Sequence, residues 1–214
     1  MYSRSGIKLR RSNCVRMKKG LIIFQKNAEP GKVKTRLAKD IGDKAAFEAY
    51  LQLVSYTHKV AAACEVDKLL FFSDYLENNL ENYPVDYRFE LQSGNDLGQK
   101  MRNAFHTFFA EGYRQLVIIG TDCPEISPDL IERAFAYLEE NDAVIGPAED
   151  GGYYLLGMKT LISGLFEGIP WSTSQVSTIT KDFLTANNYT FAILPVLSDV
   201  DYKEDWDKFK SQLQ

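Results

Sequence analysis

Acidic side chains follow two apolar stretches of this 214-residue chain, at points where a strand would end. Asp122 comes shortly after the run at 116–119, and Asp199 and Asp201 come after the run at 190–195. Each could simply cap a turn or a helix. However, a parallel sheet brings its strand ends together, and carboxylate oxygens suit Mg²⁺ or Mn²⁺. A carboxylate of the second segment could therefore complete a divalent-metal site with Asp122.

A basic loop that contains glycine follows the first apolar run of the chain. The segment NAEPGKVKTRL (27–37) holds Gly31, Lys32, Lys34 and Arg36. Glycine lets the backbone approach a ligand closely, and lysine and arginine neutralise phosphate. The fingerprints GxxxxGK[ST] and GxGxxG do not occur in it, which disfavours a P-loop kinase and a Rossmann dehydrogenase. Taken alone, the loop is more simply a solvated basic segment.

A double glycine lies between these two acidic regions. In PAEDGGYYLLG (147–157), Asp150 precedes Gly151 and Gly152 and leads into an aromatic stretch. Asp-Gly is a strong hairpin signal, and a hairpin does not exclude a ligand on its open backbone. Phosphate-binding cations combined with divalent-metal carboxylates predict a site for a nucleotide di- or triphosphate.

The elements that would position these residues alternate between strands and helices. Short apolar or alternating runs predict strands at 20–24, 67–73, 87–92, 115–120, 142–148, 153–158 and 190–195. Helical spacing predicts helices at 43–63, 97–112, 127–141, 172–188 and from 202 onward, with one long loop at 25–42. This alternation predicts a single α/β domain with an open, mostly parallel sheet and helices on both faces. Ligands bind such sheets beyond the carboxyl ends of the strands.

Charge is distributed unevenly along the chain. The first nineteen residues carry seven basic and no acidic side chains, which leaves 18 of the 25 basic and all 29 acidic residues in the remainder. An acidic body argues against nucleic acid as the partner. The basic head lacks the apolar core of a secretory signal. We therefore expect a poorly ordered basic extension at 1–17 and one domain at 18–214.

The cysteines indicate a reducing compartment. Cys14, Cys64 and Cys123 are far apart and form no C-x-x-C pair, which predicts reduced thiols and a cytoplasmic protein. With only two histidines besides, a zinc site is disfavoured. No stretch approaches the roughly 18 apolar residues that a membrane helix needs.

Longer motifs connect these features to a known family. FQKNAEPGKVKTRL, GTDCP, PAEDGGYYLLG, PWST and DVD follow one another in this order. Over roughly residues 20–207 the chain thereby resembles the DUF2064 family of glycosyltransferases, a type associated with radical-SAM and selenium proteins. It is more distantly similar to 2-phospholactate guanylyltransferase. The resemblance implies a GT-A-like, nucleotide-diphospho-sugar transferase fold.

The resemblance also implies which residues would bind the nucleotide and the metal. The phosphates would be bound by Gly31, Lys34 and Arg36. The divalent cation, Mg²⁺ or Mn²⁺, would be held by Asp122 and Asp201. The base and ribose would be lined by Asn95, Asp96 and Gly98.

On the acceptor side, the same resemblance places the double glycine and the PWST segment. The residues expected there are Asp150, Gly151, Gly152, Trp171 and Ser172. Asp150 would orient or deprotonate an acceptor hydroxyl, while Lys34 and Arg36 would stabilise negative charge on the leaving group.

These roles predict a metal-dependent transferase that acts on a nucleotide-activated substrate. Glycosyl transfer from a nucleotide-diphospho-sugar to a small-molecule acceptor is the favoured reaction. Nucleotidyl transfer from an NTP with release of pyrophosphate is the alternative, because Thr121-Asp122-Cys123 stands where many GT-A enzymes carry D-x-D. A nucleotide-binding module without turnover is the third hypothesis. The base, sugar, acceptor and oligomeric state stay open.

Overall fold

The computed structural model describes residues 17–84 and 86–213. Apart from Met17, the predicted basic extension lies outside these ranges. Within them the strands are β1 (Lys19–Gln25), β2 (Asp67–Phe72), β3 (Tyr87–Leu91), β4 (Gln115–Ile119), β5 (Ala143–Pro147), β6 (Tyr153–Met158) and β7 (Phe191–Ile193). The helices are α1 (Thr35–Ile41), α2 (Asp43–Ala62), α3 (Leu97–Ala110), α4 (Pro128–Glu140), α5 (Val176–Ala186) and α6 (Lys203–Leu213), with the short turns η1 (Leu80–Asn82) and η2 (Ser163–Phe166).

The described strands form one mostly parallel sheet in the order β3-β2-β1-β4-β6-β5-β7. β1 pairs in parallel with β2 and β4, β2 with β3, and β5 with β7. β6 runs antiparallel between β4 and β5, because a hairpin at 148–152 reverses the chain after β5. The predicted α/β class is confirmed, and each predicted strand is present with small shifts at its ends.

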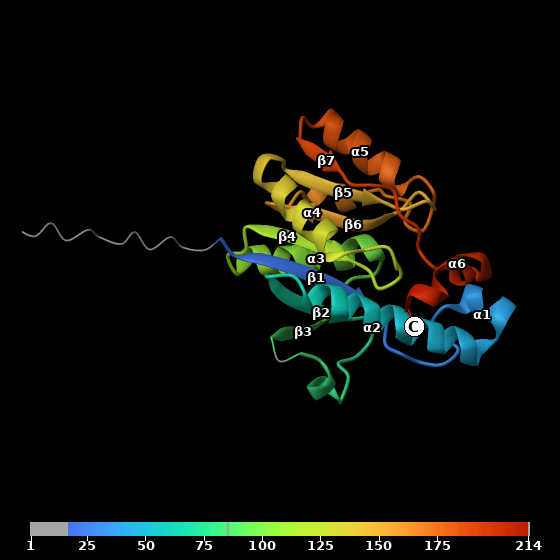
Figure 1. The fold of residues 1–214 in the computed structure, drawn as a ribbon. Coiled ribbons are helices and arrows are strands. Elements are labelled where there is room, and N and C mark those ends of the chain that lie inside the picture. Colours follow the sequence, from blue (N-terminus) through green and yellow to red (C-terminus); the bar gives the residue numbers. More distant parts are fainter. Residues whose placement is uncertain (1–16, 85, 214) are drawn as a thin grey trace, which may run out of the picture.

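Helices cover both faces of the sheet (Figure 1). Leu21 and Ile23 of β1 pack in a cluster with residues of α2 and α4, whereas the intervening Ile22 packs with residues of α3. Because both faces are covered, the central strands are apolar at nearly every position, as is usual in parallel sheets. This explains why they were recognisable as continuous apolar runs.

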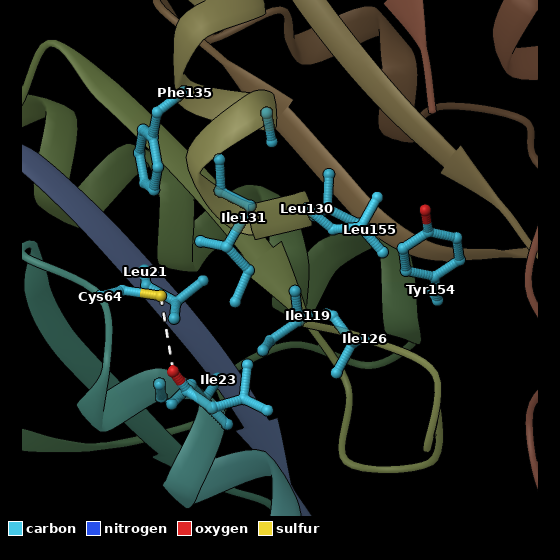
Figure 2. Packing of buried hydrophobic residues seen from close by; sticks show 14 of the residues in the cluster. Leu21, Ile23, Cys64, Ile119, Ile126, Leu130, Ile131, Phe135, Tyr154 and Leu155 are labelled. Carbon is cyan, nitrogen blue, oxygen red and sulfur yellow. Dashed lines mark hydrogen bonds between the residues drawn. The ribbon is translucent and has the colours of Figure 1, made fainter. Parts of the chain in front are cut away.

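Figure 2 shows the core beneath α4, where Ile131 and Phe135 lie over Leu21 of β1 and Ile119 of β4. At the margin of this layer the thiol of Cys64 donates to the carbonyl of Val60 at 3.5 Å. Cys64 and Cys123 are both buried free thiols, and Cys14 lies outside the described residues. Among residues 17–84 and 86–213, no helix combines the length and apolar character that crossing a membrane requires.

The prediction of one long loop at 25–42 is wrong, because α1 forms within it. Leu37 of α1 is fully buried against α2 and α6, in a small cluster that includes Val200 and Phe209. Figure 1 shows α1 and α6 side by side, although they lie at opposite ends of the domain sequence. A seven-residue helix depends on such tertiary packing, and its own apolar pattern is too short to reveal it.

The helix predicted at 172–188 begins later, at Val176. Ser172 has a backbone φ of 66°, in the left-handed region that a helix interior excludes. The hydroxyl of Thr173 accepts from the backbone amide of Gln175 at 3.4 Å, which makes a local turn before the helix. Residues 172–175 are therefore a loop, and they lie beside the candidate site.

Candidate active site at the strand ends

The site lies where the direction of the strand order reverses. β1 has β2 on one side and β4 on the other, so the chain segments that leave β1 and β4 diverge at their carboxyl ends. Such a reversal opens a crevice at the edge of the sheet. The segments after β1 and β4 begin at Lys26 and Gly120, and both enter the walls of the pockets found there.

Two adjoining pockets occupy this crevice. The larger, of about 420 Å³, is lined mainly by charged and polar residues of 32–36, 150–153, 171–176 and 199–201. The smaller, of about 280 Å³, has a more apolar wall that includes Phe24 and Met101. The residues that line both pockets are Lys26, Tyr50, Leu97, Asp122, Tyr153 and Asp199. We call the two pockets together the strand-end cleft.

Carboxylates gather at the centre of the strand-end cleft because two segments run side by side. The backbone amide of Val200 donates to the carbonyl of Asp122 at 2.9 Å, and the amide of Ser198 donates to the Glu125 carboxylate at 2.9 Å. This places Asp199 close to Asp122. Burial, and then the negative charge of Asp122, raise the pKa of Asp199 to about 7.

Lys34 lies among these carboxylates. Its side chain is only 4% exposed and forms an ion pair with Asp122, while its ammonium lies 3.7 Å from the carboxylate of Asp201. It also donates to the carbonyl of Val200 at 2.7 Å. Arg36, which is more exposed, pairs with Asp201 at 2.8 Å. The predicted cations and the predicted metal ligands thus lie together, and they are paired with one another.

The predicted metal ligands lie in one cleft but in an arrangement that includes Lys34. Within the described residues, no group of three or more His, Cys, Asp or Glu side chains has the spacing of a metal site. The ammonium of Lys34 stands between Asp122 and Asp201. The assignment of a metal to this pair stays a prediction.

The Asp-Gly-Gly turn forms part of the cleft wall, and the hairpin that it predicted is present. Gly151 has a φ of 88°, and a Cβ on it would lie 2.1 Å from the carbonyl oxygen of Ser174. Its own carbonyl accepts from the amide of Ser177 at 2.9 Å. Gly151 therefore fastens the turn to the loop before α5, which leaves Asp150 and Gly152 in the cleft wall.

Trp171 and Ser172 also line the cleft. The indole of Trp171 packs so closely on Gly98 that a Cβ there would lie 2.4 Å from its ring nitrogen. It meets the ring of Tyr153 edge-on, with centroids 6.5 Å apart. This aromatic pair gives the cleft an apolar side next to its charged centre.

The residues predicted to contact base and ribose have structural roles here. Asp96 caps α3 by accepting from the amide of Gln99 at 2.8 Å, and the amide of Asn95 donates to the Gln99 side chain at 3.1 Å. Gly98 is buried under Trp171. Leu97 is the residue of this segment that lines the cleft. Contact of Asn95, Asp96 and Gly98 with a base stays a prediction, as does contact of Gly31 with phosphate.

The sequence analysis missed several cleft residues, of which Lys26, Tyr50 and Tyr153 line both pockets. Lys26 follows β1 directly, Tyr50 comes from the middle of α2, and Tyr153 begins β6. Lys26 carried a signal, since it is a cation at a strand end within the quoted motif. Tyr50 carried none, because its position looks like any core position of an amphipathic helix.

Comparison with known proteins decides the family. The family model described as "Uncharacterized protein conserved in bacteria (DUF2064)" matches residues 56–173, more than half of the chain. The chain belongs to the DUF2064 family. None of the curated proteins compared with this DUF2064 chain matches it.

Solved structures resemble this DUF2064 protein over most of its length. A Desulfovibrio desulfuricans G20 protein described as a "putative nucleotide-diphospho-sugar transferase" is 32% identical, with a TM-score of 0.81, and the match covers 87% of this chain and 83% of that one. The 4-diphosphocytidyl-2C-methyl-D-erythritol synthase of Anaerococcus prevotii DSM 20548 is 14% identical, with a TM-score of 0.61 and coverage of 92% and 96%. A manganese complex of Rv0371C from Mycobacterium tuberculosis H37Rv is 13% identical, with a TM-score of 0.55 and coverage of 90% and 97%.

The expected fold is thereby confirmed as that of the nucleotide-diphospho-sugar transferases. The two more distant structures share this fold at identities too low to indicate activity. The function has to be argued from the residues of the strand-end cleft.

Proposed function

We propose that this DUF2064 protein is a divalent-cation-dependent transferase that moves a glycosyl group from a nucleotide-diphospho-sugar to a small-molecule acceptor. The observation that carries the proposal is a single cleft that combines Lys34 and Arg36 with the carboxylates of Asp122 and Asp201. A nucleotide diphosphate and its cation require both types of charge in one place. The 32% identity with the Desulfovibrio protein supports this substrate class.

In donor type, the carboxylates of the cleft suit a hard divalent cation such as Mg²⁺ or Mn²⁺, which would have to displace Lys34 from Asp122. Asp122, Asp199 and Asp201 supply carboxylate oxygens, which both ions prefer. Asp122 and Asp199 lie close enough for the charge of one to oppose ionisation of the other, and a divalent cation offsets that repulsion. When bound, the ion would neutralise the nucleotide phosphates. Asp122 would hold it, with Asp199 and Asp201 from the neighbouring segment.

The remaining cleft residues have complementary tasks in this proposal. Arg36 points a half-exposed guanidinium into the cleft, where it can bind phosphate oxygens of the leaving group with two parallel hydrogen bonds. Asp150 lies exposed in the cleft wall, where its carboxylate can orient an acceptor hydroxyl and accept its proton. Trp171 and Tyr153 supply an apolar surface that keeps water from the transferred group.

Nucleotidyl transfer is the second candidate, and one feature of the chain favours it. The carboxylates come from two separate segments, at 122 and 199–201, and the segment after the central strand β4 carries one acidic residue instead of D-x-D. In that reaction a phosphorylated substrate would attack the α-phosphorus of an NTP, and pyrophosphate would leave. Arg36 would then stabilise the pyrophosphate instead of a nucleoside diphosphate.

Product analysis separates these reactions. The protein is incubated with Mn²⁺, mixed small-molecule acceptors and a panel of either nucleotide-sugars or NTPs. The nucleoside diphosphate and pyrophosphate that are released are then quantified. The Asp122→Asn variant, treated in the same way, is the control. Nucleoside diphosphate released above the Asp122→Asn background supports glycosyl transfer. Pyrophosphate released above that background moves the assignment to nucleotidyl transfer. Binding of a nucleotide without either product in any panel contradicts a catalytic function.

A further inference from the structure

The basic residues of the strand-end cleft divide into paired and unpaired ones. Lys32 pairs with Glu29 at 2.5 Å, Lys34 pairs with Asp122, and Arg36 pairs with Asp201. Lys26 also lines the cleft, and its ammonium forms no ion pair or hydrogen bond with any residue in 17–84 or 86–213. Its charge is therefore available to a ligand without breaking an existing contact.

The backbone around Lys26 is held firmly although its side chain is exposed. Gln25 and Asn27, on either side, are 1% and 3% exposed. The hydroxyl of Tyr50 donates to the carbonyl of Lys26 at 2.5 Å. The side-chain amide of Asn27 donates to the carbonyl of Tyr75 at 3.0 Å, and its side-chain oxygen accepts from the backbone amide of Asp74 at 3.0 Å.

Lys26 therefore has an exposed and unpaired ammonium on an ordered backbone. Because the backbone is already ordered, less entropy is lost when the ammonium is immobilised on a ligand.

The position of Lys26 relates it to both pockets. It belongs to the wall that the 420 Å³ charged pocket shares with the 280 Å³ apolar pocket. The apolar pocket is lined by Phe24, Met101 and Gly120, and a Cβ on Gly120 would meet nothing within 4 Å. Aromatic and aliphatic side chains together with open backbone suit a flat base. A ligand with its base there and its charged part in the larger pocket would cross the boundary between the pockets, where Lys26 is the one basic residue among the six that line both.

We propose that Lys26 is a phosphate-binding residue of the site, and that it contacts the phosphate nearest the nucleoside at the boundary between the two pockets. This inference rests on the proposed function, since it assumes a nucleotide ligand. A lysine ammonium is a compact point charge that binds phosphate oxygens well. The role differs from that of Lys34, whose side chain is buried and holds Asp122 and the carbonyl of Val200 together.

The test compares Lys26→Met with Lys26→Arg, and uses Lys44→Met as the matched control. Lys44 is an exposed lysine of α2 outside the cleft. Calorimetry first measures binding of four nucleoside diphosphates to the wild-type protein in the presence of Mn²⁺: UDP, CDP, GDP and ADP. The diphosphate that binds most tightly, its nucleoside and inorganic pyrophosphate are then titrated into each variant. Melting temperatures without ligand report on folding.

We expect Lys26→Met to weaken binding of the diphosphate and of pyrophosphate by about tenfold or more, since it removes a charge-assisted hydrogen bond. Binding of the nucleoside alone should be unchanged, Lys26→Arg should keep most of the affinity, and Lys44→Met should match wild type. The ligand-free melting temperature should not move, because the Lys26 side chain is exposed and its ammonium contacts no charged or polar group among the described residues.

Two outcomes would overturn the inference, and they are distinguishable. If wild type binds a diphosphate and Lys26→Met binds it equally well, the role of Lys26 is wrong while the proposed function stands. If wild type binds none of the four diphosphates with Mn²⁺, the proposed function itself fails and the inference fails with it.

Discussion

At the scale of single residues, acidic and basic side chains of the strand-end cleft form ion pairs with one another. Asp122, Lys34 and Arg36 could be selected from the sequence because the motifs that contain them occur together and in order, although each motif alone has a simpler structural explanation. Their partners could not be predicted. Pairing depends on the hydrogen bond between the amide of Val200 and the carbonyl of Asp122, which joins segments about eighty positions apart. Whether Asp199 or Asp201 faces Asp122 depends on the same contact.

Substitution of Asp199 tests this arrangement of charge. Its pKa is about 7 in the folded protein and about 3.8 in the unfolded chain, so the folded protein loses stability progressively as pH rises from about 4 to 7. Asp199→Asn should raise the free energy of unfolding by roughly 2–4 kcal/mol at pH 8 without ligand. The gain should shrink toward pH 5, where the folded wild type keeps this carboxyl protonated. Urea denaturation at both pH values measures it, and an equal gain at both would contradict the account.

His58 of α2 gives a second pH dependence. Its Nε2 lies 2.7 Å from the Gln25 side-chain oxygen, while the Gln25 amide donates to the hydroxyl of Tyr83 at 2.9 Å. The Gln25 oxygen therefore accepts, and His58 Nε2 carries the proton of a neutral ring. Burial lowers the pKa of His58 to about 4.

Because the unfolded chain binds this proton near pH 6.5 and the folded protein only near pH 4, stability should fall as pH decreases between those values. The fall assigned to His58 is about 3 kcal/mol. His58→Gln should flatten the pH dependence of the unfolding free energy in this window, whereas His106→Gln, at an exposed position on α3, should leave it as in wild type. Parallel profiles for wild type and His58→Gln would refute the assignment.

At the scale of elements, most of the fold could be predicted from apolar patterning. α4 began where Ser127 and Pro128 indicated, and the hydroxyl of Ser127 accepts from the amide of Leu130 at 3.3 Å. α1 could not be predicted, since its stability comes from α2 and α6. The late start of α5 could not be predicted from the apolar pattern either. It depends on contacts between the turn at 150–152 and the loop at 172–175, which precedes α5.

The contact of Gly151 with that loop can be tested against a second glycine. Gly151 and Gly168 both have positive φ, but a Cβ on Gly168 would meet nothing within 4 Å, whereas one on Gly151 would overlap the carbonyl of Ser174. Gly168→Ala should cost about 1 kcal/mol of stability from backbone strain alone. Gly151→Ala should cost about 3 kcal/mol or more, since the loop must also move. Equal losses in chemical denaturation would show that the contact is unimportant.

At the scale of the whole molecule, the cleft is assembled from the ends of strands that the sequence separates widely. The order of the sheet brings the segments after β1 and β4 together, and the hairpin at 148–152 and the segment at 199–201 close around them. Alternating strands and helices predicted that edge as the ligand site. The alternation could not predict the two adjoining pockets. Their shape depends on side chains such as Tyr50 and Tyr153, whose positions are determined by tertiary packing.

The central claim is that a divalent cation and a nucleotide bind together at the carboxylates of the strand-end cleft. The most direct test is an anomalous difference map, measured near the manganese absorption edge, from crystals grown with Mn²⁺ and the tightest-binding nucleoside diphosphate. The account predicts an anomalous peak beside Asp122 and the 199–201 segment, with Lys34 moved off the Asp122 carboxylate. A bound nucleotide whose manganese peak lies elsewhere, or that binds with no manganese peak at all, would contradict it.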